Sequence, residues 1–479
     1  MPITASSGAL TYAKAINNVN PDYWFIQPSG ADLSDFNFLL VDSASEEIYV
    51  SSNASGLYSY FTSLNSLSNP NIKYLSRLAN SAGGSRTLNL NMQFVQTSAN
   101  DVWLPGKHQV PGTQFPNPLQ NWGILVNINP STGITGTGYG YTPEQIADEP
   151  GYILEIRQAA FVSALNSGWL AWYQDNPYQF HQVGIFRIGA SGAITDELKL
   201  AFNDPKNTTG GLKLTNANED PIILHSIEGI PSGTNARPPG VILRKIDKTP
   251  VAPNPTTLVV LWNMVIEQPT ALGAVLSVTP TDLNLDSDDN SYFTFYDSLS
   301  GIGYLAKVDT NGTLQWQRQI ASTNLYGVVI KSDTEIYVIG VTSTNKLWIA
   351  EFNESGTVQW QNEMIGSSAF TKDAFDKSTA KIDYYDNNLY LGANGGYISN
   401  QWSVSKVPDD GTIVGNGEYV FPDGSIITYQ TSSQTVTTST LTISSSASTQ
   451  PQTNNRGNST GGAIISQSTP AKAIAFPLE

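Results

Sequence analysis

The acidic run Asp286–Asn290 is the stretch of this sequence whose residue types and spacing come nearest to a chemical site. Its Asp-x-Asp-x-Asn pattern matches the opening of a calcium-binding loop, in which alternate side chains supply oxygen ligands. However, the sixth position is Ser291 instead of glycine, and the twelfth is Asp297 instead of glutamate. The pattern therefore favours a solvated turn between two strands, with an ion site as the alternative, and we assign no metal ligand.

Other catalytic constellations are weaker still. The three histidines, His108, His181 and His225, show no spacing typical of a metal site. No serine lies in a G-x-S-x-G motif between a strand and a helix, and nothing singles out a carboxylate pair of the kind glycosidases use. Cysteine is absent, which excludes thiolate ligands and disulfides. We therefore predict a protein that is not an enzyme and has no cofactor, with no catalytic, cofactor-binding or metal residue assigned.

Aromatic residues near the proline-rich segment 105–121 are candidates for a binding surface. Trp103 and Trp122 flank this segment, and indole rings stack on the apolar faces of sugars. We name these two residues as possible glycan-facing positions. Trp169, Trp172 and Tyr173 lie in a strand-like run, where packing between sheets is the favoured interpretation. The segment Pro105–Asn121 is expected to be a rim loop, because proline cannot donate to a strand ladder.

The elements that would position these residues are revealed by a repeat. The chain contains GYLAKVDTNGTLQWQRQI from Gly303 and KLWIAEFNESGTVQWQNEM from Lys346. In each copy an alternating apolar run leads into a turn with glycine and then into a second run. This order predicts a β-hairpin. Trp316 and Trp360 occupy the same place in the second strand, where a large ring can cover the flank of a sheet.

Related turns recur along the whole chain, with further strand-like runs before each of them. In the seventh unit these runs are Lys381–Tyr385, Asn388–Ala393 and Trp402–Val407. Seven four-stranded units packed face to face around an axis predict an all-β fold, a seven-bladed β-propeller, over residues 1–430. The N-terminal strand 9–16 is expected to close the ring by completing the last blade. An eighth blade built from residues 425–446 is the alternative.

Composition restricts the partners. The chain has 479 residues and a net charge of −16, with only 13% charged residues, so basic side chains are scarce. Such a chain is repelled by phosphate backbones and anionic lipid surfaces, so we predict no nucleic-acid partner. The first residues lack a basic segment followed by an apolar run, and no apolar stretch is long enough for a membrane helix. We therefore expect neither a secretory leader nor membrane insertion.

Residues 431–479 are predicted to form an extended tail rich in Ser and Thr, because this composition cannot bury a core of its own. Within the tail, Thr437–Ser444 alternates in a way that suits an edge strand supplied by a neighbour. Apolar character returns at Ile474, Phe476 and Leu478. These three residues are candidates for docking to another subunit. The alternative is that this end folds back onto its own propeller.

The repeat also resembles a known class. The segments around Trp316 and Trp360 resemble the bacterial β-propeller repeat of quinoprotein-like proteins, in which an aliphatic strand, an Asp-x-x-Gly turn and a Trp-containing strand follow one another. The resemblance is specific over about Tyr304–Met364, extends to Val183–Phe202 and is weak elsewhere. It implies a propeller. The quinoprotein dehydrogenases themselves use Ca²⁺, an Asp base and often a vicinal disulfide, and the disulfide is impossible here.

Propeller repeats joined to a Ser/Thr-rich tail also resemble the virion proteins of marine bacteriophages, especially tail or appendage components. This resemblance implies a structural protein of the virion that has a host-surface contact role and other virion proteins as partners through the C-terminal tail. The expected location is the virion, assembled in the host cytoplasm. The alternatives are a bacterial cell-surface propeller that binds glycans and a degenerate quinoprotein-like enzyme.

Overall fold

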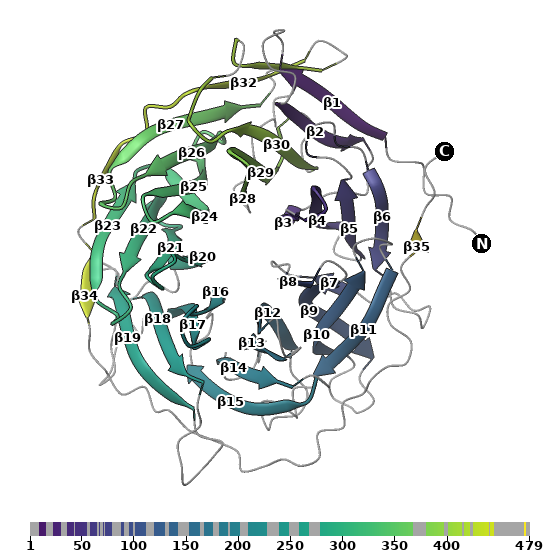
Figure 1. Ribbon diagram of the computed structural model, residues 1–479, viewed down its shortest axis with the longest axis vertical. Coiled ribbons are helices and arrows are strands. Elements are labelled where there is room, and N and C mark those ends of the chain that lie inside the picture. Colours follow the sequence, from purple (N-terminus) through teal and green to yellow (C-terminus); the bar gives the residue numbers. More distant parts are fainter. Residues whose placement is uncertain are drawn as a thin grey trace.

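The computed structural model describes residues 9–15, 23–29, 36–42, 44–54, 58–64, 67, 70, 72–78, 88–90, 95–98, 101–111, 119–129, 134–141, 153–162, 167–175, 182–189, 192–201, 209–227, 239–248, 258–267, 278–366, 380–396, 401–413, 416–421, 425–439, 441–444 and 474–475. In this part of the chain the regular structure is entirely β, and small antiparallel sheets stand around a central axis (Figure 1). Seven such sheets, the blades, complete the circle. The predicted seven-bladed propeller is confirmed, and the eight-bladed alternative is wrong.

The first four blades follow one another along the chain. Blade 1 contains β3 (Phe36–Asp42), β4 (Glu47–Ala54), β5 (Tyr58–Leu64) and β6 (Ile72–Leu78). Blade 2 contains β7 (Leu88–Leu90), β8 (Val95–Ser98), β9 (Asp101–Pro111), β10 (Leu119–Asn129) and β11 (Ile134–Tyr141). Blade 3 contains β12 (Ile153–Val162), β13 (Ser167–Asp175), β14 (Gln182–Ile188) and β15 (Ile194–Ala201). Blade 4 contains β16 (Thr209–Leu214), β17 (Pro221–Ile227), β18 (Gly240–Asp247) and β19 (Val259–Glu267).

The remaining blades use both ends of the chain. Blade 5 contains β20 (Val278–Leu285), β21 (Ser291–Asp297), β22 (Ile302–Val308) and β23 (Leu314–Ile320). Blade 6 contains β24 (Thr323–Ser332), β25 (Glu335–Thr342), β26 (Leu347–Phe352) and β27 (Val358–Ile365). Blade 7 contains β28 (Ala380–Tyr385), β29 (Asn388–Asn394), β30 (Trp402–Pro408), β2 (Trp24–Ser29) and β1 (Ala9–Ala15). The later strands are β31 (Glu418–Val420), β32 (Ile426–Thr431), β33 (Val436–Thr438), β34 (Thr442–Ser444) and β35 (Ile474–Ala475).

Ring closure involves a hairpin and not the single predicted strand. The N-terminal segment does join blade 7, but β2 is the strand that pairs with β30, with Phe25 opposite Ser405. The predicted strand 9–16 is seen as β1, which pairs with the outer side of β2. Strand β2 has no turn motif before it that matches the repeat. The repeat pattern therefore predicts β1 and not β2. Trp24 further ties the hairpin to blade 1, since its indole N–H donates to the carbonyl of Leu67 at 3.0 Å.

The proline-rich segment predicted as a rim loop begins as a strand. Residues up to Pro111 belong to β9, which pairs with β10 from Val102 opposite Ile128 to Pro111 opposite Leu119. On the other edge of β9, two short strands leave a gap: β8 pairs with residues 101–103 and β7 with residues 106–108. Pro105 falls in that gap. Its missing N–H therefore coincides with a break in the ladder, which is where proline is tolerated in a sheet.

The tryptophan of the repeat connects successive blades. Trp262, Trp316 and Trp360 lie on the outer strands β19, β23 and β27, and each ring packs on the hairpin turn of the next blade. The Trp316 indole N–H donates to the carbonyl of Glu354 in that turn at 2.7 Å. The turn glycine, Gly356, has φ of +73°, and a Cβ there would lie 2.8 Å from the ring. The repeat therefore encodes contact between blades as well as the hairpin itself.

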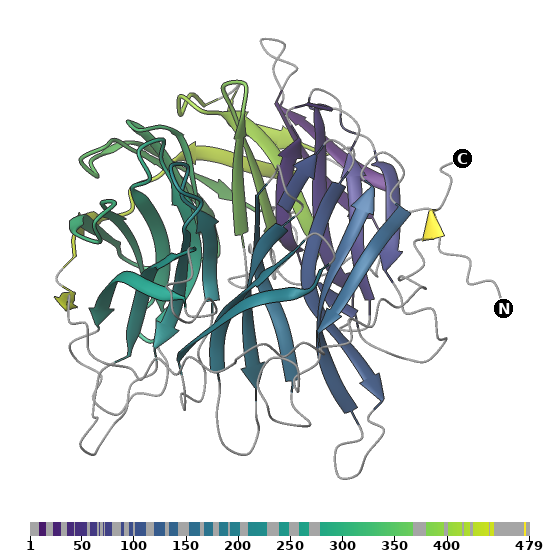
Figure 2. The same ribbon diagram turned by 60° about the horizontal axis from the view of Figure 1, so that its bottom comes forward.

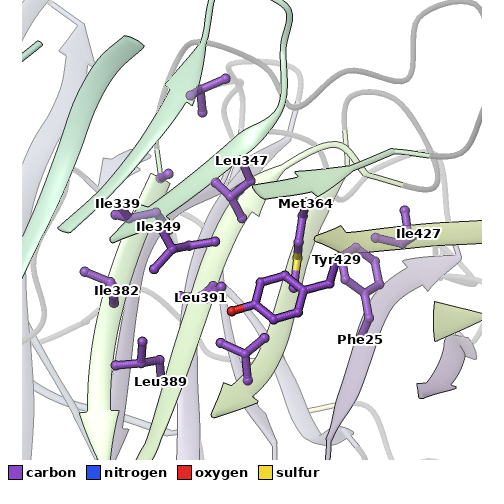
Figure 3. Close-up of a cluster of buried hydrophobic side chains, with 14 of the residues drawn as sticks. Phe25, Ile339, Leu347, Ile349, Met364, Ile382, Leu389, Leu391, Ile427 and Tyr429 are labelled. Atoms are coloured by element: carbon purple, nitrogen blue, oxygen red, sulfur yellow. The ribbon is translucent and has the colours of Figure 1, made fainter. Parts of the chain in front are cut away.

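The core consists of apolar seams between adjacent blades. Figure 3 shows the seam between blades 6 and 7, where Leu347 and Ile349 of β26 face Leu389 and Leu391 of β29. Phe25 from the N-terminal hairpin and Ile427 and Tyr429 from β32 complete this cluster (Figure 3). Both ends of the chain therefore contribute to one seam.

Beyond blade 7 the chain reverses its direction around the ring. Strand β32 pairs with β27 of blade 6, β33 with β23 of blade 5, and β34 with β19 of blade 4. We call the described residues 425–439 and 441–444 the belt. The belt runs along the outer margin of the ring in Figure 1, and Figure 2 shows the same arrangement from a second direction. The sheets thus continue past the predicted boundary at residue 430, and the belt supplies a fifth strand to three blades.

Candidate functional site

The innermost strands bring charged side chains together at the axis. Lys213 of β16, Asp282 of β20, and Lys381 and Asp383 of β28 line a cavity of about 120 Å³. Side chains from β3, β12 and β24 complete its wall. No local motif marks these residues, because they lie in different blades and meet only when the ring closes. This cavity, lined by charged side chains of separate blades, is the candidate site.

Lys381 is the cation at the centre of this group. It is buried, and its ammonium group donates to two backbone carbonyls, Thr281 O and Tyr326 O, both at 3.1 Å. The Asp282 carboxylate lies 3.6 Å away. Burial lowers the pKa of Lys381, while Asp282 acts in the opposite direction. Because the carbonyls belong to blades 5 and 6, this one side chain from blade 7 holds three blades together.

The two carboxylates also bind backbone groups of a neighbouring blade. Asp282 of blade 5 accepts the N–H of Val328 in blade 6 at 3.1 Å. Asp383 of blade 7 accepts the N–H of Val41 in blade 1 at 2.8 Å. Asp383 lines the cavity, and burial raises the pKa of its carboxyl to about 6, against the opposing effect of the N–H groups of Val41 and Tyr384, which it accepts.

The chemistry open to this site is limited by those bonds. A carboxyl with a pKa of about 6 beside a buried lysine is a combination found in acid–base catalysis. Structural networks perturb pKa values in the same way. Here the polar atoms of Lys381, Asp282 and Asp383 are directed at backbone groups of adjacent blades. The arrangement therefore stabilises the closed ring.

The acidic run at residues 286–290 forms the predicted turn between strands, in which Ser287 and Asp288 are exposed while Asp286 and Asp289 are buried. Asp286 is buried and accepts the backbone N–H of Asn290 at 2.8 Å and that of Asp288 at 3.1 Å, which fixes the turn between β20 and β21. Asp289 is also buried and accepts the backbone N–H groups of Asn216, at 2.5 Å, and Ala217, at 3.1 Å, in blade 4. The sequence could not reveal this partner, because it lies about one blade away along the chain.

The described residues contain no group of three His, Cys, Asp or Glu side chains arranged for a metal ion. His225 is buried in β17, and its Nδ1 lies 3.0 Å from the carbonyl oxygen of Ser226. The side chain of His108 and the whole of His181 lie outside the described residues.

Most of the tryptophans named as candidates serve in packing between blades. Trp169 and Trp172 are buried between blades, as predicted. Trp103 stacks on Tyr139 and Phe161 at centroid distances of 5.6 and 5.5 Å, so its ring is engaged in packing within and between blades 2 and 3. The side chain of Trp122 lies outside the described residues. Sugar binding by Trp103 and Trp122 stays a prediction.

The predicted docking residues lie near the C-terminal end. Ile474 pairs with Arg77 through β35, which adds to the outer strand β6 of blade 1. This backbone pairing places Ile474 on the chain's own propeller, in line with the fold-back alternative. Phe476 and Leu478 lie outside the described residues. Docking of these three residues to another subunit stays a prediction.

No family model matches the chain, and no curated protein sequence matches it. Among solved structures, the chain is similar to an oligogalacturonate lyase in complex with manganese, with 8% identity, a TM-score of 0.47, and coverage of 84% of this chain and 98% of that one. The polysaccharide lyase Uly1 gives 9% identity, a TM-score of 0.44, and coverage of 85% and 98%.

A third similar structure is a putative 6-phosphogluconolactonase from Bacteroides uniformis, with 12% identity, a TM-score of 0.40, and coverage of 74% of this chain and 95% of that one. At these identities the likeness concerns the propeller architecture alone. In the described part of the chain, no helix has the length and apolar character needed to cross a membrane.

Proposed function

We propose that the protein is a non-enzymatic structural component of a bacteriophage virion, in a tail, fibre or surface appendage, where it also contacts the host surface. The proposal joins two arguments. One concerns the interior of the ring, where the charged groups serve closure. The other concerns the sequence, whose repeat, absence of cysteine and Ser/Thr-rich tail are typical of such proteins.

The observation that carries the structural role is the set of bonds at the axis. Lys381 joins blades 5, 6 and 7, and Asp383 joins blade 7 to blade 1. A catalytic group must be able to reach a substrate, whereas the polar atoms of Lys381 and Asp383 are bonded to backbone atoms of the ring. The belt adds strands on the outside of three blades. A ring tied at its axis and at its margin is suited to carrying load in an assembly.

The test is quantitative mass spectrometry of density-purified virus particles, compared with the supernatant and cell envelope of the same culture. We expect the protein to sediment with particles at a fixed ratio to the major capsid protein. Recovery in the envelope fraction would reject the virion proposal and favour the cell-surface glycan-binding alternative. In that event, an array of saccharides would be screened for those that raise the melting temperature of the protein.

A second measurement separates structure from catalysis. Purified protein should show no turnover of acidic polysaccharides and no quinone-dependent dye reduction with added Ca²⁺. If turnover occurs and is lost in Lys381→Met while the variant stays folded, the interpretation of the axis as a purely structural site is wrong.

A further inference from the structure

The belt has an internal repeat of seven residues. Its units read SIITYQT from Ser425, SSQTVTT from Ser432 and STLTISS from Ser439. Each unit starts with serine, has threonine in the fourth place, and has a large aromatic or aliphatic residue in the fifth. The residues in the fifth place are Tyr429, Val436 and Ile443.

The three units bind three blades in the same register. Tyr429 pairs with Met364, Val436 with Ile320, and Ile443 with Ile266. Each of these three partners lies four residues after the tryptophan of its blade's outer strand. One unit of seven residues therefore corresponds to one blade, and the register is kept across blades 6, 5 and 4.

Contacts between units repeat as well. The N–H of Ser432 donates to the carbonyl of Gln361 at 3.0 Å, and the N–H of Ser439 donates to the carbonyl of Gln317 at 3.3 Å. Both glutamines directly follow the tryptophan of their blade. The Gln361 side chain donates to the carbonyl of Gln434 at 3.1 Å, and the Gln317 side chain donates to the Ser439 hydroxyl. The outer edges of blades 6 and 5 thus offer the same backbone acceptor to the belt.

On blades 5 and 4 the belt makes few contacts, although these contacts are regular. On blades 5 and 4 each ladder contains three residue pairs. Thr435, Thr437 and Thr438 are exposed, and Val436 and Leu441 pack only partly buried on the seams. Short edge strands with little buried apolar surface contribute modest stability, so they can leave their edge at low cost.

We propose that the acceptor edges of blades 4 and 5 also take the belt of a second copy of this chain, so that copies are linked by exchanged strands. The ladder is made by backbone atoms of the unit, and a second copy presents the same atoms in the same order. Exchange of an identical element is a low-cost route to association, since each bond lost within a chain is regained between chains. This inference does not depend on the virion assignment.

The absence of cysteine allows a direct test. Gln319 and Thr437 are paired between β23 and β33, and no side-chain hydrogen bond joins either of them to the rest of the described chain. Full-length Gln319→Cys protein and full-length Thr437→Cys protein, with tags of different length, are mixed at increasing concentration and oxidised. We expect a mixed disulfide dimer that increases with concentration. The matched control is Thr195→Cys, an exposed position on blade 3, which should give no mixed dimer with Thr437→Cys.

The double variant Gln319→Cys/Thr437→Cys reports the pairing within one chain. An internal disulfide in this variant without any mixed dimer would overturn the proposal, because the belt would then stay on its own propeller. Mixed dimers that form equally well with the Thr195→Cys control would also overturn it, since they would reflect random collision. If neither the internal disulfide nor the mixed dimer forms, the pairing of Gln319 with Thr437 is itself wrong. In the unmodified protein, native mass spectrometry should show dimers that are lost in Val436→Asp.

Discussion

Substitution of Gly356 by alanine tests whether the tryptophan contact between blades contributes to stability. Gly356 has φ of +73°, a conformation that costs an L-residue about 1 to 2 kcal/mol. In addition, the new Cβ would lie 2.8 Å from Cδ2 of Trp316, so the ring must move. Its hydrogen bond to Glu354 O, worth about 0.5 to 1.5 kcal/mol, would be weakened together with the ring packing. We expect a total loss of roughly 3 kcal/mol.

Gly301→Ala is the matched control. Gly301 has φ of +64°, but a Cβ there would meet no atom within 4 Å, so the substitution costs only the energy of the unfavourable backbone conformation. We expect this variant to lose about 1 to 2 kcal/mol. Urea unfolding followed by tryptophan fluorescence and by circular dichroism gives both values. In a Trp316→Leu background, the loss of unfolding free energy caused by Gly356→Ala should decrease to that of the control. Equal losses for the two glycines in the native background would refute the idea that the ring is tightly held.

Three further predictions concern the polar contacts between blades. The carboxyl of Asp383 has a pKa of about 6 in the folded protein, against an ordinary value of 3.8, so its protonated form stabilises the fold, and this stabilisation is lost as the pH rises from about 4 to about 6. Asp383→Asn should therefore gain stability relative to the native protein over this range, by up to about 3 kcal/mol at pH 7. Urea titrations at several pH values measure this difference. Lys381→Met should destabilise the ring by about 1 to 3 kcal/mol, because Thr281 O and Tyr326 O lose their buried donor; a native-like thermal midpoint would contradict this. Asp289→Ala should lower the midpoint of thermal unfolding by leaving two N–H groups of blade 4 without their acceptor, whereas Asp288→Ala in the same turn should change it little.

The sequence predicts the blades best where the repeat is most regular. In blade 7 the expected runs Lys381–Tyr385, Asn388–Ala393 and Trp402–Val407 agree with β28, β29 and β30 to within a residue. The alternation and the glycine turns are local signals, so no tertiary information was needed. Blade 2 is less regular, and the prolines of β9 concealed a strand because the ladder has a gap at Pro105.

The axial site could not be predicted from local patterns. Lys213, Asp282 and Lys381 are far apart in the sequence, and each is an ordinary charged residue within a strand. Their convergence follows from the order and number of blades, and therefore from closure of the ring. The belt is a different case. Its seven-residue repeat is present in the sequence, but its meaning depends on the spacing between the outer strands of neighbouring blades.

The belt also explains how the outer edges of the ring are protected. An exposed apolar edge strand is a template for unwanted pairing, and proteins protect such edges with charges or with cover. The outer strand β19 of blade 4 reads VVLWNMVIE, with charge only at Glu267, and β34 covers the part from Val265 to Glu267. The outer strand β15 of blade 3 reads ITDELKLA, where Glu197 and Lys199 provide charge along the strand. Cover by the belt is therefore found on an edge whose own sequence provides little protection, and this gives the C-terminal segment a structural role in each copy even before any strand is exchanged.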